Sequence, residues 1–194
     1  MSGDVSDKLY AELQARGAIL DGHFKLSSGR HSNRFVQKFR ILEDPVLVEV
    51  VAKALADNVR SLQPTVVVSA AVGGIVLGYE VARQLGVLGI FVEKEDGVAT
   101  LRRGFALAPT DRALIVEDVV TTGLSVREVI DVVKSAGASV AAVGLIVQRS
   151  EVDFGVPTFP LLFLPIESYA PADCPQCRAG EAIIEPGSRF LKPA

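Results

Sequence analysis

Two adjacent acids, Glu117 and Asp118, end an apolar run, and a loop rich in hydroxyl groups, 121–125, follows them directly. A loop between a strand and a helix favours an anion, because free backbone N–H groups and the helix dipole meet there. Gly123 allows close approach of the backbone, and the threonine and serine hydroxyls add donors. The acids would repel a phosphate in direct contact but would accept hydrogen bonds from a diol. The segment therefore predicts a site for a ribose 5-phosphate.

The same carboxylates could also stabilise a cationic sugar transition state electrostatically. A plain strand, loop and helix with surface acids remains an alternative when this stretch is considered by itself. The loop lacks the GK[ST] ending of a Walker A motif and the GxGxxG pattern of a dinucleotide site.

The elements around this stretch alternate between strand and helix after Pro64. Apolar runs predict strands at 65–70, 87–93, 112–118 and 139–149, with helical spacing between them. Strands that are apolar throughout indicate a parallel sheet covered on both faces. We therefore expect an α/β fold: an open parallel sheet flanked by helices, preceded by a helix (4–18) and a hairpin (22–42). Ligands of such sheets lie beyond the carboxyl ends of the strands. That rule singles out 69–74, 93–103, 117–125 and 148–149.

The bulk composition fits one compact domain, with 194 residues of which 49% are hydrophobic. A net charge of -3 argues against a large nucleic-acid footprint. The longest apolar stretch, near 138–147, is about half of the roughly 20 residues that a membrane span needs. The N-terminus has neither a basic n-region nor an apolar h-region, so we expect no signal peptide and a cytoplasmic protein.

The two cysteines, Cys174 and Cys177, lie in the sequence CPQC. Two cysteines are too few for a disulfide framework. A structural zinc site takes four Cys or His ligands, and the motif supplies two. We interpret the motif as a tight turn near the C-terminus. A redox pair is disfavoured because no βαβ start follows, and a metal shared across a dimer stays open.

The stretch 113–125 closely resembles the ribose-phosphate motif of the type I phosphoribosyltransferases. Four further segments resemble the orotate phosphoribosyltransferases in order and spacing: GHFKLSSGRHSNRFVQ, VVVSAAVGGIVLGYEVARQLG, FVEKEDGVATLRRGF and GLIVQRS. The resemblance implies transfer of a phosphoribosyl group from 5-phosphoribosyl 1-diphosphate (PRPP) to orotate. It also implies a type I phosphoribosyltransferase fold as a single domain over 1–194. Its core would span about 43–159, and its hood about 1–42 with a tail of about 160–194.

The resemblance assigns roles residue by residue. Glu117 and Asp118 match the acid pair that binds the ribose hydroxyls, and Lys94 matches a cation on the flexible catalytic loop. Lys94 and Asp118 are the expected catalytic residues. The expected PRPP-binding residues are Lys94, Glu117, Asp118, Val119, Val120, Thr121, Thr122, Gly123, Leu124 and Ser125.

Three residues are expected at the base. Arg149 matches the arginine that holds orotate, and a planar guanidinium suits a planar carboxylated ring. Thr121 would reach the base and Phe35 would stack near it, although core packing of the hairpin explains Phe35 nearly as well. The expected pyrophosphate loop is Ala71, Val72, Gly73 and Gly74.

The resemblance further implies Mg²⁺ held mainly through the substrate, with no protein ligands, and a homodimer whose catalytic loop reaches the neighbouring subunit's site. No nucleic-acid or membrane partner is expected. The sequence departs from the family at Ser27, where many members have lysine, at Gly73, where some carry lysine, and at Glu93, where arginine is common. Lys25 could replace the first of these lysines. A phosphoribosyltransferase for another base, and a nucleotide-sensing regulator on the same fold, remain alternatives.

Overall fold

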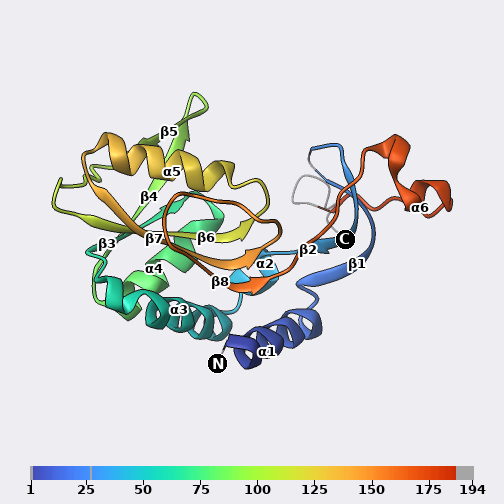
Figure 1. Cartoon of the computed structure of the whole chain (residues 1–194), viewed down its shortest axis with the longest axis horizontal. Coiled ribbons are helices and arrows are strands. Elements are labelled where there is room, and N and C mark those ends of the chain that lie inside the picture. Colours follow the sequence, from blue (N-terminus) through green and yellow to red (C-terminus); the bar gives the residue numbers. More distant parts are fainter. Residues whose placement is uncertain (1, 27, 187–194) are drawn as a thin grey trace.

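The computed structural model describes residues 2–26 and 28–186, in a larger body built on a sheet and a smaller outer lobe (Figure 1). The helices are α1 (Ser2–Ala15), α2 (Phe39–Leu42), α3 (Pro45–Val59), α4 (Gly73–Leu85), α5 (Leu124–Ser135) and α6 (Pro175–Arg178), with 3-10 turns η1 (Arg60–Leu62) and η2 (Pro171–Asp173). The strands are β1 (Ile19–Lys25), β2 (His31–Val36), β3 (Val66–Ala70), β4 (Leu88–Glu95), β5 (Val98–Leu101), β6 (Arg112–Val120), β7 (Ser139–Gln148) and β8 (Thr158–Phe163).

The main sheet has the strand order β5-β4-β3-β6-β7-β8. All its pairs are parallel except β4 with β5. The expected open, mostly parallel sheet is therefore confirmed. Because β3, β4, β6 and β7 run the same way, their carboxyl ends meet at one edge.

The helices cover both faces of the sheet, as continuous apolar strands require. One buried cluster joins α1, α3 and α4 to inward side chains such as Val67, Leu114 and Ile146. A second cluster joins α5 to the alternate side chains, among them Val68 and Ile115. Two-residue alternation along each strand thus fixes which side chains face which helix layer.

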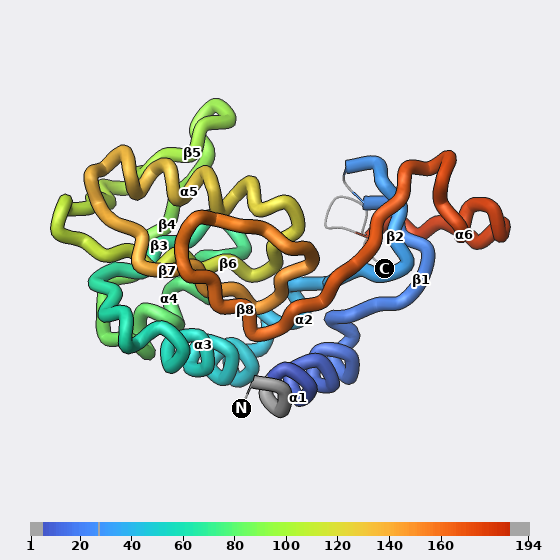
Figure 2. Tube along the Cα trace, viewed as in Figure 1, coloured from blue at the N-terminus to red at the C-terminus, as the bar shows by residue number. Residues whose placement is uncertain are grey.

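The outer lobe consists of the β1–β2 hairpin and residues 167–186, which return to it after β8 (Figure 2). Two isolated bridges join these segments, Phe24 with Ile184 and His31 with Tyr169. Neither buried cluster of the main body includes Phe24, although this ring is only 2% exposed. Ile19 and Val36, at the base of the hairpin, belong to the first cluster, so the hairpin is anchored to the body there and Phe24 packs separately from it.

Three local expectations differ from the structure. The hairpin spans Ile19 to Val36 instead of 22–42, and α2 takes up the end of the expected range. The stretch 93–103 is mostly a second hairpin, β4–β5, whose turn residues Asp96 and Gly97 both have positive φ. Strand β8 was not anticipated, because Pro160 interrupts the run; an edge strand tolerates a proline that a central strand would not.

Within the described ranges, no helix is both long and apolar enough to cross a membrane. Ser27 lies outside the described residues, and Lys25 forms an exposed ion pair with Glu185 (2.7 Å). The division into a core and a hood within one domain stays a prediction.

Candidate active site

The loop after β6 forms a cavity of about 190 Å³ with the first turn of α5. Glu117 and residues 119–126 line it. Gly123, the residue before α5, has φ 77°, and a Cβ there would lie 2.7 Å from the Phe154 ring. Only glycine fits both demands. The sequence therefore places backbone donors and hydroxyl groups at a helix start, as an anion site requires.

The two acids lie in β6 itself, so their side chains leave the strand on opposite faces. Glu117 lines the loop cavity and accepts a hydrogen bond from the backbone N–H of Asp118 (3.0 Å). Burial, followed by the neighbouring charge of Asp118, raises the pKa of Glu117 to about 8. Burial therefore favours the neutral, protonated form of this carboxyl in the absence of a ligand.

Asp118 is turned toward the layer of α2 and α4. The Lys38 ammonium lies 3.0 Å from its Oδ2 and 3.3 Å from its Oδ1. The exposed fraction is 2% for the Asp118 side chain and 36% for Lys38. A partly exposed cation thus lies beside a buried carboxylate at the carboxyl edge of the sheet.

The segment 71–74 comes between β3 and the first turn of α4, beside the same pair. The Ala71–Val72 peptide bond is cis. A Cβ at Gly73 would lie 2.2 Å from Asp118 Oδ2 and 2.6 Å from Lys38 Nζ. Glycine is therefore required here by close packing against the ion pair.

Arg149 follows β7 and is only 8% exposed. Its Nε is buried and has no hydrogen-bond partner among the described residues, and burial lowers the pKa of the guanidinium. Its backbone N–H donates to Val120 O (2.8 Å), and the Ser150 hydroxyl donates to Thr121 O. A buried cation for which the described part of the chain offers no counter-charge thus lies next to the anion loop, where a ligand carboxylate would satisfy it.

The other two predicted residues stand apart from this group. Phe35 lies on β2, in the outer lobe, and its ring centroid is 5.8 Å from that of Phe24. Lys94 lies near the end of β4 rather than in an irregular loop, and its ammonium pairs with Glu128 of α5 (2.8 Å). Arg103 pairs with Glu93 within the same hairpin, which lowers the pKa of Glu93.

Lys38 was not predicted as a site residue. It was visible only as one cation of the acid-free basic stretch 22–42. The signal that could have identified it is the glycine at position 73, which leaves space for a cation from another element.

Residues 40–153 match the phosphoribosyl transferase domain family. The chain is 50% identical to the orotate phosphoribosyltransferase of Pelotomaculum thermopropionicum, over 95% of this chain and 98% of that protein. It is 48% identical to the orotate phosphoribosyltransferase of Thermotoga maritima, over 93% and 97%.

Solved structures are similar in fold. A crystal structure of orotate phosphoribosyltransferase from Aeropyrum pernix matches with a TM-score of 0.68 and 29% identity, covering 80% of this chain and 93% of that one. A Mycobacterium tuberculosis orotate phosphoribosyltransferase matches with a TM-score of 0.69 over 82% and 96%, and at 23% identity it supports the fold alone.

Proposed function

The chain belongs to the orotate phosphoribosyltransferases, and we propose how its own residues divide the work of that reaction. The enzyme transfers the 5-phosphoribosyl group of PRPP to orotate, giving orotidine 5′-phosphate and diphosphate in pyrimidine biosynthesis. A ring nitrogen of orotate forms the new bond to the anomeric carbon as the bond to the diphosphate oxygen breaks. Positioning and electrostatics suffice for this displacement, and no side chain has to act as nucleophile.

The 5′-phosphate is assigned to the loop 121–125. Its cavity combines a helix start with hydroxyl donors, and Glu117 is the one carboxylate that lines it. The ribose would lie with its 5′ end at this loop and its anomeric end toward Gly73. Glu117 then accepts from the hydroxyl nearer the phosphate end, the 3′-hydroxyl. Asp118, beside Gly73, accepts from the 2′-hydroxyl next to the anomeric carbon.

The leaving diphosphate is assigned to residues 71–74 and to Lys38. The Lys38 ammonium occupies space that a side chain at Gly73 would otherwise fill, and it is the cation nearest to this segment in the contacts of the described residues. It would therefore supply, from another element, the positive charge that a lysine at position 73 provides in some relatives. Charge build-up on the diphosphate is stabilised by a cation already held in place.

The observation that carries the orotate assignment is Arg149, whose buried Nε has no partner among the described residues and whose backbone N–H binds Val120, the residue before Thr121. Orotate carries a carboxylate on a flat ring, whereas adenine, hypoxanthine and uracil carry none. A guanidinium that pairs with this carboxylate recovers the free energy lost on burial, and a neutral base would leave it unpaired. Phe35 is proposed to stack on the base when the outer lobe and the body enclose it.

Phosphoribosyltransferases generally use Mg²⁺ with PRPP. The donors present fit this ion, because Glu117 and Asp118 supply hard carboxylate oxygens where the ribose hydroxyls would lie. We propose that Mg²⁺ binds mainly through oxygens of PRPP itself. Bound there, it would neutralise charge on the diphosphate.

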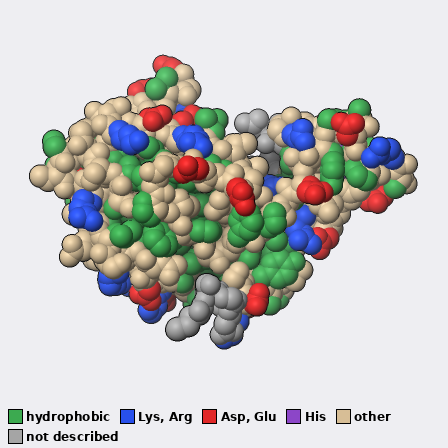
Figure 3. Space-filling view, in the orientation of Figure 1, with side chains coloured by type: hydrophobic (Ala, Val, Ile, Leu, Met, Phe, Trp, Pro, Cys, Tyr) green, Lys and Arg blue, Asp and Glu red, His purple; other side chains and the backbone are tan. Residues whose placement is uncertain are grey.

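A homodimer is proposed from an apolar stripe beside the diphosphate segment. Val72, Val76 and Tyr79 are 76%, 50% and 70% exposed, and they follow one another at helical spacing. We propose that a second copy covers this stripe and that the neighbour's β4–β5 hairpin, with Lys94, then reaches the site. Charged side chains of both signs are interspersed on the face in Figure 3, with no large field of one sign there. A cytoplasmic location stays a prediction.

The assay follows the loss of orotate absorbance with PRPP and Mg²⁺, with adenine, hypoxanthine and uracil tested in parallel by product analysis. Orotate consumption alone is expected. Turnover of another base in place of orotate would contradict the role of Arg149. Tight binding of PRPP without turnover of any base would favour a nucleotide-sensing role for the same site.

A further inference from the structure

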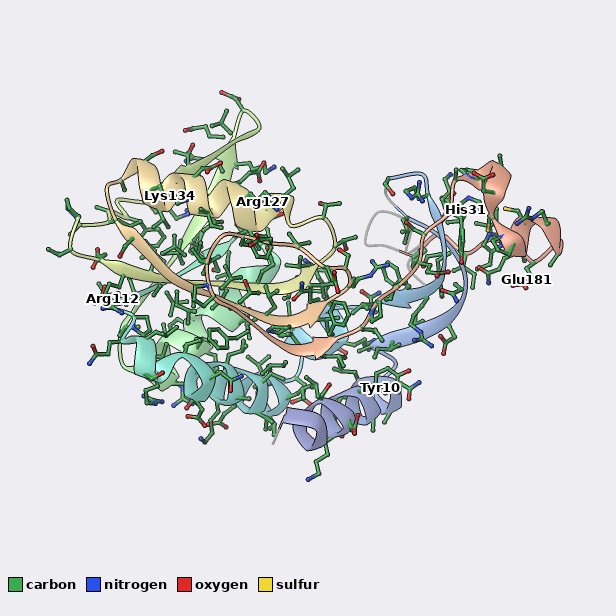
Figure 4. All side chains as sticks on the ribbon, viewed as in Figure 1. Tyr10, His31, Arg112, Arg127, Lys134 and Glu181 are labelled. Carbon is green, nitrogen blue, oxygen red and sulfur yellow. The ribbon has the colours of Figure 1, made fainter. Side chains whose placement is uncertain are left out.

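The outer lobe gathers four side chains that the reaction does not use. His23 and His31 come from β1 and β2, Cys174 directly precedes α6, and Cys177 lies within it. The chain contains two histidines and two cysteines in all, and every one of them is in this cluster. His31 and Glu181 mark its place at the far end of the lobe in Figure 4.

The spacing of the four ligand atoms matches a tetrahedral metal site. All lie within 4.8 Å of one another. His23 Nε2 is 3.0 Å from His31 Nδ1, 3.4 Å from Cys174 Sγ and 3.6 Å from Cys177 Sγ, and His31 Nδ1 is 3.1 Å from Cys177 Sγ. Zn–N and Zn–S bonds of normal length give tetrahedron edges of about 3.3–3.8 Å. Small shifts, outward for the two shortest pairs, would complete the geometry.

The His23 ring is also oriented as a zinc ligand requires. His23 Nδ1 lies 3.0 Å from the backbone oxygen of Glu181. Donation from Nδ1 to this carbonyl fixes the tautomer that leaves the lone pair of Nε2 facing the cluster, as outer hydrogen bonds do for metal-bound histidines. His23, His31 and Cys174 are 2%, 4% and 0% exposed, so solvent does not satisfy these groups.

The lobe has a structural need for such a link. Its buried apolar side chains are few: Ile19 and Val36 join the first core cluster, and Phe24 lies outside both clusters. Units with little buried apolar surface are commonly stabilised by a metal or by disulfides. The cluster joins residues separated by 151 positions, at His23 and Cys174, and so fastens the C-terminal segment to the hairpin.

We propose that His23, His31, Cys174 and Cys177 hold one Zn²⁺ ion in a closed structural site within a single chain. Two thiolates and two imidazoles select zinc over the hard cation of the reaction, which prefers oxygen. Four protein ligands leave no open position for catalysis, so the ion stabilises the lobe that carries Phe35. The tight-turn interpretation of CPQC is thereby extended, and no second subunit is needed to complete the ligand set.

The test measures zinc by mass spectrometry in untagged full-length protein. The protein is expressed in medium that contains zinc and is then freed of loosely bound metal. About one zinc per chain is expected. Cys174→Ser and His23→Ala are expected to lose it, whereas Gln176→Ala, which changes a residue between the cysteines but no ligand, keeps it. The two ligand variants, unlike Gln176→Ala, should melt at lower temperature and be cut sooner by protease within 167–186. The helix and strand content of the body should be retained.

Cobalt exchange into the unaltered protein gives a second readout that does not depend on a variant folding. Tetrahedral d–d bands with thiolate-to-cobalt charge transfer would support the site. Zinc-free native protein that also fails to give these bands would overturn the proposal. A Cys174–Cys177 disulfide in the freshly purified protein, or full zinc in both ligand variants, would overturn it as well.

Discussion

The ammonium of Lys38 lies 3.0 Å from Asp118 Oδ2, and the two residues are separated by 80 positions in the chain. This pair ties the segment between the hairpin and α3 to the end of the central strand β6. The pair also restricts position 73 to glycine, since a Cβ there would meet both side chains. One ion pair thus connects the proposed diphosphate segment, the ribose acids and the connection to the outer lobe.

Replacing Lys38 by Met should raise KM for PRPP and lower kcat, because the diphosphate loses its fixed cation. Hydrogen bonds to charged groups contribute about 1.5–3 kcal/mol, so kcat/KM should fall by about tenfold to hundredfold. Lys38→Arg should recover part of the loss. Steady-state kinetics with PRPP varied provide the measurement.

The matched control is Lys53→Met, which removes an exposed ion pair with Asp57 on α3 and should leave both constants unchanged. Equal kinetics for the Lys38 and Lys53 variants would contradict the role of Lys38. Since Lys38 also neutralises a buried carboxylate, the melting temperature should be recorded alongside.

Adding one methyl group at Gly73 should be more damaging than adding one in the body of the sheet. A Cβ at Gly73 would lie 2.2 Å from Asp118 Oδ2, whereas the nearest atom to a Cβ at Gly144 is Leu55 Cδ2 at 3.5 Å. Gly73→Ala should therefore displace the ion pair, destabilise the fold by about 1–3 kcal/mol and abolish most activity. Gly144→Ala should be tolerated. Thermal unfolding and turnover of both variants decide this, and an active Gly73→Ala enzyme would show that the pair is not required.

The sheet and the anion loop could be predicted from sequence because their signals are local. Continuous apolar runs identified β3, β4, β6 and β7, and the loop before α5 follows its strand directly. Strand β8 escaped because Pro160 breaks its pattern, and only its position at the sheet edge makes that proline harmless.

Contacts between distant segments could not be predicted in the same way. Lys38 was one cation among several in a basic stretch, and Gly73, the one hint of space for a cation, did not indicate which of them would meet Asp118. The cysteines were counted as two ligands, since the two histidines of the hairpin lie more than a hundred residues away, with 151 positions between His23 and Cys174. In each case the fold supplies a partner that local spacing does not reveal.

Removing the Arg149 guanidinium should weaken orotate selectively. Arg149→Ala should lower kcat/KM for orotate by about 100-fold or more, in line with the loss of one partner of a buried charge pair. KM for PRPP should change little. Arg149→Lys keeps the charge but loses the planar fork, so it should restore only part of the activity. Arg112→Ala, at the opposite end of the sheet, is the control and should leave orotate kinetics unaltered. A parallel rise in both KM values after Arg149→Ala would indicate a general structural defect.

Mixing two inactive variants should test whether Lys94 acts in the neighbouring subunit. Lys94→Ala and Arg149→Ala would each lack one contribution to every site. If Lys94 crosses the interface, hybrid dimers contain one intact site, and mixing with subunit exchange should restore part of the activity. The control mixes Lys94→Ala with Lys94→Met, which should remain inactive. No recovery in hybrids that are verified by mass would place Lys94 in the site of its own chain.

The raised pKa of Glu117 should make stability fall as pH rises. Its pKa is about 8 in the folded chain and 4.5 when unperturbed, so the folded state holds the extra proton between these values. The contribution of Glu117 to the free energy of unfolding should therefore be highest below about pH 4.5 and should decline as the pH rises to about 8. The slope reaches about 1.4 kcal/mol per pH unit at most. Denaturant titrations across this range measure it.

Glu117→Gln should remove this decline, because a neutral amide takes the place of the protonated carboxyl without titrating. The ribose hydroxyl contact predicts a second consequence, since an ionised Glu117 is the better acceptor. In the native enzyme kcat/KM for PRPP should rise toward about pH 8, and in Glu117→Gln it should be lower and flatter over the same range. A native stability curve that parallels that of Glu117→Gln would mean that Glu117 is already ionised at neutral pH, and the acid pair would then carry two negative charges before PRPP binds.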